Sequence, residues 1–433
     1  MFSLLYLWYR KNSRKAVIGL ILSCVTSVPV MAQSQNNWTL KNSILRAIEV
    51  APETRGAQAA VNARQGALKQ AGAWPNPQIE LRTDNKIGKD EGAGGFDFTQ
   101  FAFSQPLPLS GRIGHQQSIA RSMLNAARTD HQYKQVLLET KVALHYHTLQ
   151  LAVERLHLAK LRLQLADNLQ SIGRRRATAG ELSKLERLRL DLIRESAQQI
   201  MDKAEGAYNE ALSQFRAYLG LPSTVIIKLT PLRPFGPIPD LKQLIADLTK
   251  HAKLQTAQHQ LKSARLKVNL ARAERFPDLT LSLFNERDFL NGRRQNVTGI
   301  GLSISVPLWD RNSGRIDEAL AQSIQSQSKL QVIERDLGTR LLQGYLHLNH
   351  LIQQGEHYRT RVLKPAKKVF ELSRKAYAGG ELGILSLIDA NNTYFNARER
   401  YLELLQEAWL EASEVRLAAG RSLVKNKLDT DHE

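Results

Sequence analysis

Residues 71–81 read AGAWPNPQIEL and residues 271–281 read ARAERFPDLTL, so a similar segment occurs twice, with Pro77 and Pro277 lying 200 positions apart. Two further pairs of similar segments keep the same order, FSQPL at 103–107 with ISVPL at 304–308, and ATAGEL at 177–182 with AGGEL at 378–382. Three landmarks in one order at nearly one offset predict a tandem duplication of the chain.

Each half has the same expected order of elements. A helical stretch, at 40–72 and at 241–275, ends where a proline prevents its continuation. Two short segments then alternate apolar with polar residues, which predicts strands. The apolar positions are Ile79, Leu81, Phe96, Phe98, Phe101, Phe103, Leu279, Leu281, Leu283, Ile300, Leu302, Ile304 and Val306. A slip in the phenylalanine alternation predicts a β-bulge, and the polar segments 84–95 and 286–296 predict hairpin loops.

A long helix is expected next in each half. The segment 112–174 has 63 residues without a proline and would extend about 95 Å as a helix. Two apolar series recur in it every seven residues, on faces about 200° apart. The series are Val142, Leu149, Leu156 and Leu163, and Leu144, Leu151, Leu158, Leu165 and Ile172. Two seams favour a helix with a neighbour on each side, as in a closed wall of helices, over a helix buried in a bundle, which would be apolar over a broader arc.

Four amphipathic strands are too few to close a barrel, which needs about eight. The sequence therefore predicts an α+β membrane protein, a tandem-repeat protomer of long helices that contributes four strands to a barrel shared with other copies. The expected domains are a signal peptide at 1–32, a first repeat at 33–218, a proline-rich crossover at 219–240, a second repeat at 241–424 and a polar tail at 425–433.

The first 32 residues have the pattern of a secretory signal peptide. Basic residues precede an apolar stretch at 16–30, and small residues precede an expected cut after Ala32. The alternatives are a single anchoring helix and a lipid-modified N-terminus at Cys24. Cleavage after Ala32 is favoured because Leu22 is a poor residue for a lipidation motif. Export argues against a nucleic-acid partner despite the net charge of +19.

Composition excludes several classes of protein. A mean hydropathy of −0.34 excludes a polytopic helical membrane protein, and a single cysteine excludes a disulfide framework. Because no nucleophile motif or phosphate-binding loop is visible, we expect no catalytic residues and no enzyme. No zinc-ligand spacing occurs, so we expect no metal site and no cofactor. The histidine pairs His147 and His347, and His157 and His357, would form rings that touch passing cations if they faced a tunnel.

Four motifs together resemble a known family. They are Asn76-Pro77, QPLPLSGR at 105–112, VPLWDR at 306–311, and YAGGEL at 377–382 followed by ILS at 384–386 and DA at 389–390. In combination they resemble the TolC-like outer-membrane efflux protein family, over about residues 37 to 424. The motif VPLWDR at 306–311, where the chain leaves its last predicted strand and which we call the exit motif, is most similar to the CzcC-like heavy-metal branch of that family.

The resemblance implies an outer-membrane channel that extends into the periplasm. It implies a homotrimer in outer-membrane lipid that docks to a periplasmic adaptor protein and an inner-membrane efflux pump, with metal cations as cargo. The alternatives are an exported coiled-coil scaffold without channel activity and a channel for drug efflux or type I secretion. A scaffold has no use for four strands with an apolar face, so the strand segments favour the channel.

The resemblance also implies a gate at the glycine turns, Gly180 and Gly379-Gly380, remote from the strands. Basic residues gather around the first turn, either as a solvated face or as a docking surface for an acidic partner. They are Arg174, Arg175, Arg176, Lys184, Arg187, Arg189 and Arg194.

In this family a tyrosine just before the second turn bonds to the neighbouring helix pair, and acidic residues beyond the turn form a ring. By motif, Tyr377 takes the tyrosine position, with Glu186 as its expected partner, and Asp389 takes the second ring position. Ser386 occupies the first ring position, which leaves three carboxylates per trimer instead of six. The alternative is that Asp389 pairs with a nearby arginine and Tyr377 only packs.

Overall fold

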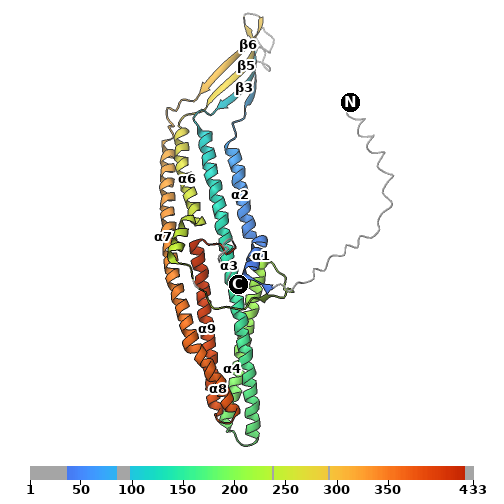
Figure 1. Ribbon diagram of the computed structural model, residues 1–433. Coiled ribbons are helices and arrows are strands. Elements are labelled where there is room, and N and C mark those ends of the chain that lie inside the picture. Colours follow the sequence, from blue (N-terminus) through green and yellow to red (C-terminus); the bar gives the residue numbers. More distant parts are fainter. Residues whose placement is uncertain (1–36, 85–97, 237, 291–292, 425–433) are drawn as a thin grey trace, which may run out of the picture. The chain divides into compact units, whose positions relative to one another are not determined.

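The computed structural model describes residues 37–84, 98–236, 238–290 and 293–424 (Figure 1). The predicted signal peptide at 1–32, the tail at 425–433 and Phe96 lie outside the described residues. From Trp38 onward the chain forms one unit.

The two halves contribute comparable sets of helices. The first half has α1 (Leu40–Val50), α2 (Pro52–Ala71), α3 (Arg112–Thr178) and α4 (Lys184–Leu219). The second half has α5 (Leu241–Asp247), the 3-10 helix η1 (Leu248–Lys250), α6 (Ala252–Ala273), α7 (Ser313–Tyr358), the π-helix η2 (Arg359–Leu363), α8 (Lys364–Ala378) and α9 (Ile384–Ala419). The predicted long helix is confirmed, since α3 has 67 residues.

The stretches predicted as continuous helices, 40–72 and 241–275, each contain a break. Pro52 lacks an N–H and begins α2, so α1 ends just before it. No proline marks the second break, at His251. Its Nδ1 accepts a hydrogen bond from the backbone N–H of Lys253 at 3.1 Å and its Nε2 lies 3.1 Å from the carbonyl oxygen of Leu417. This imidazole caps α6 against the end of α9, and nothing in the hydrophobic pattern indicated it.

Four of the strands form one antiparallel sheet in the order β2-β3-β5-β6. Their bounds are β2 Gln78–Asp84, β3 Phe98–Leu107, β5 Leu279–Leu290 and β6 Arg293–Ile304. The pairing of β3 with β5, from Leu107↔Leu279 to Thr99↔Arg287, joins the two halves. The register runs without interruption through the described residues of β3, so the predicted bulge is wrong.

The hairpin loop predicted at 286–296 is also wrong, because β5 and β6 continue through most of that segment. Its polar residues pair across the strands. The side chain of Arg287 donates to Asn296 at 3.1 Å, and that of Asn285 donates to Thr298 at 3.0 Å. Such cross-strand pairs stabilise a hairpin that has no apolar core.

One face of the sheet carries an apolar band. The register aligns Ile79, Phe103, Leu283 and Ile300 in one row across all four strands, and all four side chains are exposed. Residues one position away point to the other face, where polar and small side chains dominate. None of the described helices has an apolar stretch of the length needed to cross a bilayer.

The sheet is tied to the helices by an ion pair between the halves. Arg112, the first residue of α3, places its Nε 3.0 Å from both carboxylate oxygens of Asp278, which directly precedes β5. The Gly-Arg motif after the second strand therefore fixes where the first long helix leaves the sheet.

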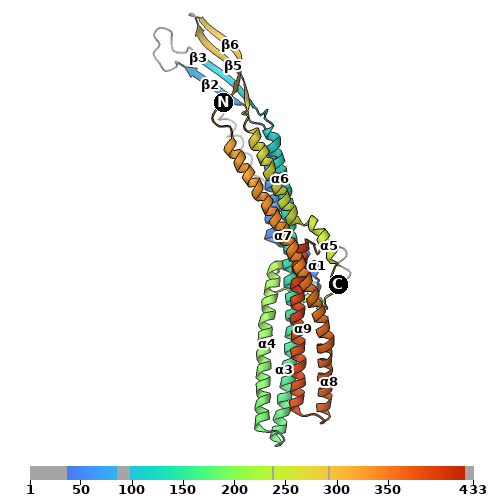
Figure 2. The same cartoon turned by 90° about the vertical axis from the view of Figure 1, so that its left-hand side faces the viewer.

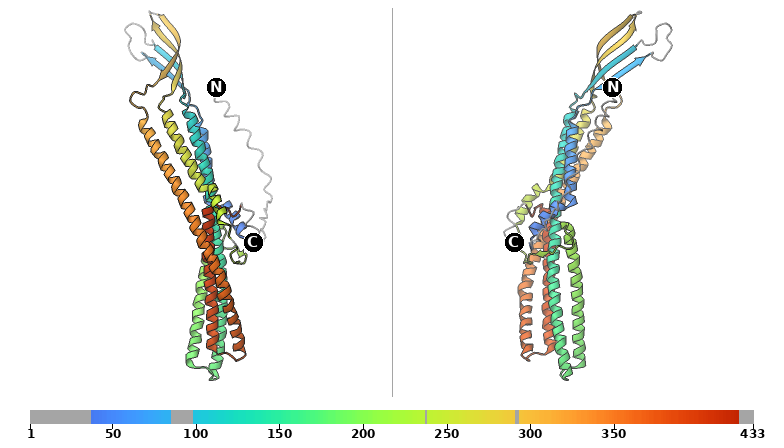
Figure 3. Two further views of the ribbon diagram at one scale, coloured as in Figure 1. Left: turned by 60° about the vertical axis from the view of Figure 1, so that its left-hand side comes forward. Right: turned by 90° about the vertical axis from the view of Figure 1, so that its right-hand side faces the viewer.

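α3 has neighbours on both sides. It packs against α2 and α6 in the part nearer the sheet, and against α4 and α9 in the part remote from it (Figures 1 and 2). The crossover between Leu219 and Leu241 contains only the short strand β4 (Lys228–Leu229) among its described residues. Its side chains Ile227, Leu229, Leu232 and Phe235 pack onto the helices. Beyond the crossover, α3 with α4 and α8 with α9 continue as two helical hairpins (Figure 3).

Candidate gate at the helix turns

The turns of the two hairpins lie at the end of the unit remote from the sheet (Figure 1). At the first, the N–H of Gly180 donates to the carbonyl of Ala177 at 3.1 Å, and that of Glu181 donates to Arg176 at 2.9 Å. This pair of bonds closes a helix when the residue after the cap is left-handed, and Gly180 has φ +74°.

The second turn repeats this geometry 200 residues later. Gly380 has φ +77° and donates to Tyr377, while Glu381 donates to Ala376 at 2.9 Å. Gly379 has an ordinary φ of −81°, so the backbone requires a glycine only at the second of the two positions. A residue with a Cβ at Gly180 or Gly380 would be strained.

Glu186 is occupied within its own helix. Its carboxylate accepts hydrogen bonds from the hydroxyl of Ser183 at 2.8 Å and from the backbone N–H of Ser183 at 3.0 Å, while the Ser183 hydroxyl accepts from the N–H of Glu186 at 3.2 Å. This capping box at the start of α4 lowers the pKa of Glu186. Within the described part of one chain, no hydrogen bond joins Glu186 to Tyr377.

Tyr377 lies between the two hairpins. Its ring packs against an apolar cluster formed by Leu169, Leu182, Leu190, Ile384, Leu387 and Ile388, and the guanidinium of Arg176 lies 5.4 Å from the ring centre. Among the described residues its buried hydroxyl oxygen has no hydrogen-bond partner. An unpaired buried hydroxyl costs about 1–3 kcal/mol.

Ser386 and Asp389 both lie exposed on the first turns of α9. Because they are three residues apart, they share one face of the helix. Within the described ranges Asp389 forms no ion pair. Arg162 of α3 donates to Asn392, three residues further along α9, at 3.2 Å.

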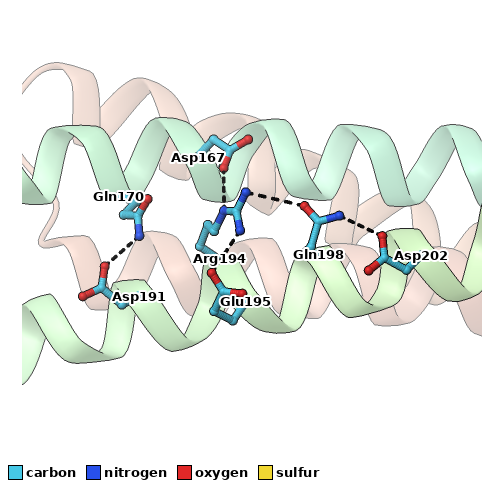
Figure 4. Close-up of polar contacts among 7 residues, drawn as sticks. All are labelled: Asp167, Gln170, Asp191, Arg194, Glu195, Gln198 and Asp202. Atoms are coloured by element: carbon cyan, nitrogen blue, oxygen red, sulfur yellow. Dashed lines mark hydrogen bonds and ion pairs between the residues drawn. The ribbon is translucent and has the colours of Figure 1, made fainter.

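A ladder of polar contacts joins α3 to α4 above the first turn (Figure 4). Arg194 donates to Asp167 at 3.1 Å and to Glu195 at 2.9 Å, and Gln170 donates to Asp191 at 2.7 Å. Arg194 is therefore used inside the hairpin. The other basic residues predicted as a docking surface are exposed and lack ion pairs among the described residues. They are Arg174, Arg175, Arg176, Lys184, Arg187 and Arg189.

Residues 44–221 and 247–421 match the family model described as Outer membrane efflux protein. The chain belongs to this family. It is 23% identical over 374 residues to the cobalt-zinc-cadmium resistance protein CzcC of Cupriavidus metallidurans, which covers 83% of this chain and 85% of that protein. It is 24% identical to the pyoverdine export outer membrane protein OpmQ of Pseudomonas aeruginosa, over 86% of this chain and 83% of that protein.

Solved structures have the same fold. The chain superposes on CusC with a TM-score of 0.73 at 19% identity, covering 88% of this chain and 92% of that one. The open-state MtrE channel of Neisseria gonorrhoeae gives a TM-score of 0.72 at 16% identity, covering 89% and 90%. The predicted family, fold class, efflux function and outer-membrane location are confirmed. Members of the outer membrane efflux protein family are channels and not enzymes.

The histidines of this outer membrane efflux protein do not both lie where they could surround a tunnel. His147 is only 6% exposed, with its ring stacked on Trp409 at 3.8 Å between centroids and its Nδ1 2.9 Å from the Gln150 side-chain oxygen. His347 is exposed and bonds to Glu411 at 3.1 Å. A ring of both histidines around a tunnel required both side chains to face it, and the buried His147 does not meet that condition. In the described ranges no three His, Cys, Asp or Glu side chains gather as a metal site requires.

Sequence reasoning also missed the contacts that join the two hairpins above the turns. Two of these contacts are ion pairs between α3 and α9. A π-helix also separates α7 from α8, and all of these segments were expected only to be long helices. Pro365, inside the expected helical run, was the available signal for the π-helix.

Proposed function

We propose that this protein is the outer-membrane channel of a tripartite efflux system, working as a homotrimer that exports metal cations. The observation that carries the proposal is the exposed apolar row across the four-stranded sheet. An apolar face of this extent is stable when lipid covers it. Three copies give a barrel of twelve strands, four from each copy, which lies within the range of outer-membrane barrels.

Exposed apolar side chains on the helices support contact with further copies. On α4 these are Leu185, Leu188 and Leu192, and on α7 they are Leu320, Ile324, Val332, Leu342 and Leu346. Scattered exposed leucines need no explanation, but repeated ones along a helix favour a partner. In the proposed trimer, neighbouring protomers cover these faces. We keep 33–218 and 241–424 as the two repeats, which the split of the family match at 221 and 247 supports.

We further propose that the helix turns dock to a periplasmic adaptor, which links the channel to an inner-membrane pump. The exposed basic residues around Gly180 support an acidic docking partner, because they form no ion pairs among the described residues. A solvated face would require no such partner.

The metal cargo rests on the exit motif and on relatives named for resistance to cobalt, zinc and cadmium. Asp389 supports it too, since converging carboxylates attract cations. Similarity to a pyoverdine exporter favours the alternative cargo, a small organic molecule. Deleting the protein should increase sensitivity to zinc, cobalt, cadmium or copper, with little change for hydrophobic drugs. Sensitivity to drugs alone would contradict the metal proposal and favour the drug-efflux alternative.

In the proposed trimer the turns converge and form the gate. The unpaired Tyr377 hydroxyl supports a partner outside its own chain. A carboxylate accepts about four hydrogen bonds, so Glu186 of a neighbouring protomer can accept from Tyr377 while it still caps its helix. Asp389 would form the acidic ring, with Ser386 as a neutral position before it.

A further inference from the structure

A small cavity lies among three helices between the two hairpins. Its walls come from α3, α4 and α9, and α3 packs against both of the others in the part of the unit remote from the sheet (Figure 2). The apolar part of the wall is formed by Leu165, Leu169, Ile193 and Ile388. The cavity measures about 20 Å³, which is room for one particle of about the size of a water molecule.

Arg162 of α3, which lines this cavity, is a cation without an anion. Its guanidinium is half-buried, donates to the neutral side chain of Asn392 at 3.2 Å, and lies 5.6 Å from the ring centre of Phe395. Among the described residues it forms no ion pair, whereas Arg155 and Arg398 at the same helix interface each meet a glutamate. Burial lowers the pKa of Arg162, and no neighbouring carboxylate opposes that shift. A charge withdrawn from water is costly unless an opposite charge meets it.

The second polar group of the cavity, Asn391 of α9, also lacks a partner. Its side chain is 8% exposed, and its Oδ1 accepts no hydrogen bond among the described residues. The amide can rotate by 180° within the same space, because its oxygen and nitrogen are nearly equal in size. In the rotated form the NH₂ group lies where Oδ1 lies now, and Asn391 becomes a donor.

The residues around the cavity select the kind of particle that fills it. None of its described lining residues is acidic, and Arg162 brings both positive charge and N–H donors. A water molecule would pair with the amide but would leave the guanidinium without a counter-ion. Sulfate or phosphate exceeds a space of about 20 Å³. A monatomic anion meets all of these conditions.

We propose that the cavity between Arg162 and Asn391 binds one chloride ion, which holds α3 against α9. The ion supplies a negative charge that the chain itself provides only nearer the sheet, in the glutamates that pair with Arg155 and Arg398. Toward the turns the contact between the hairpins becomes apolar, since Leu169 belongs both to the cavity wall and to the cluster around Tyr377. The ion binds at this site whether or not the protein exports metal cations.

Replacement of Asn391 by aspartate, which has the same shape, tests the site. In Asn391→Asp the chain supplies its own anion beside Arg162, so chloride is no longer needed. The matched control, Asn269→Asp, adds the same charge at an exposed position of α6. Thermal unfolding of the three detergent-solubilised proteins is followed by helical circular dichroism, in sodium gluconate and in sodium chloride of equal ionic strength.

Chloride should raise the unfolding midpoint of the wild type and of Asn269→Asp by about 1–2 °C, with saturation. Asn391→Asp should show no chloride effect, and in gluconate it should unfold at or above the midpoint of the wild type. Crystals of the wild type soaked in bromide should give an anomalous peak beside Arg162. An equal chloride effect in all three proteins, or a bromide-soaked wild type with only water in the cavity, overturns the proposal.

Discussion

Replacing His147 should change how stability depends on pH. The imidazole is buried against Trp409. Burial lowers its pKa from 6.5 to about 4, assisted by the nearby charge of Arg416 and opposed by the hydrogen bond to Gln150. The unfolded chain binds a proton to this histidine near pH 6.5, whereas the folded chain binds it only near pH 4. The contribution of His147 to the free energy of unfolding is therefore constant above pH 6.5. As the pH falls from 6.5 to 4, this histidine increasingly destabilises the fold.

The lowering of the pKa from 6.5 to about 4 corresponds to a loss of about 3 kcal/mol of stability below pH 4, and of about 2 kcal/mol at pH 5. In His147→Gln this part of the acid sensitivity should disappear, although the variant is less stable at pH 7.5 because packing on Trp409 is lost. The measurement is urea unfolding of the detergent-solubilised protein, followed by helical circular dichroism between pH 7.5 and 5.

The matched control is His347→Gln, which removes an exposed imidazole that bonds to Glu411 and leaves the buried ring of His147 in place. Other buried histidines act equally in all three proteins, so the difference in slope isolates His147. Parallel pH dependence of the wild type and His147→Gln would refute the assignment of a buried neutral imidazole.

Three further predictions concern the turns. Tyr377→Phe combined with Glu186→Gln should raise single-channel conductance in a planar bilayer, because a charge-assisted bond of about 1.5–3 kcal/mol is lost per protomer; wild-type conductance would argue against this gate. Asp389→Asn should weaken block by multivalent cations without opening the pore, and unchanged block would remove Asp389 from the tunnel. Gly380→Ala should lower stability by about 1–2 kcal/mol because its φ is +77°, whereas Gly379→Ala should cost little, as urea unfolding can compare; equal losses would contradict the turn geometry.

The sequence predicted the elements that local chemistry determines. A helix cannot continue through Pro77 or Pro277, whatever the rest of the fold. Alternation over Leu279 to Leu283 likewise predicts a strand without knowledge of its partner. The loop predicted at 286–296 failed because polar residues there pair across the hairpin, which requires the register. The break at His251 depends on a carbonyl 166 residues away, in Leu417, and no local signal indicates it.

The candidate gate divides in the same way. The glycine turns followed from the need for a left-handed residue after a helix. The partner of Glu186 could not be predicted in this way. Its carboxylate can either cap its own helix or bond to a distant tyrosine, and the sequence does not distinguish the two. The ion pair between Arg155 and Glu399 joins residues 244 positions apart, and any exposed arginine on α3 looks equivalent in sequence.

In the proposed assembly, three copies of this chain share one membrane barrel. Native mass spectrometry of the protein extracted from outer membranes in mild detergent measures the number of protomers per particle. Trimers should persist without cross-linking and dissociate on heating, since only the complete barrel pairs the edge strands β2 and β6. Particles that contain only one or two chains would contradict it.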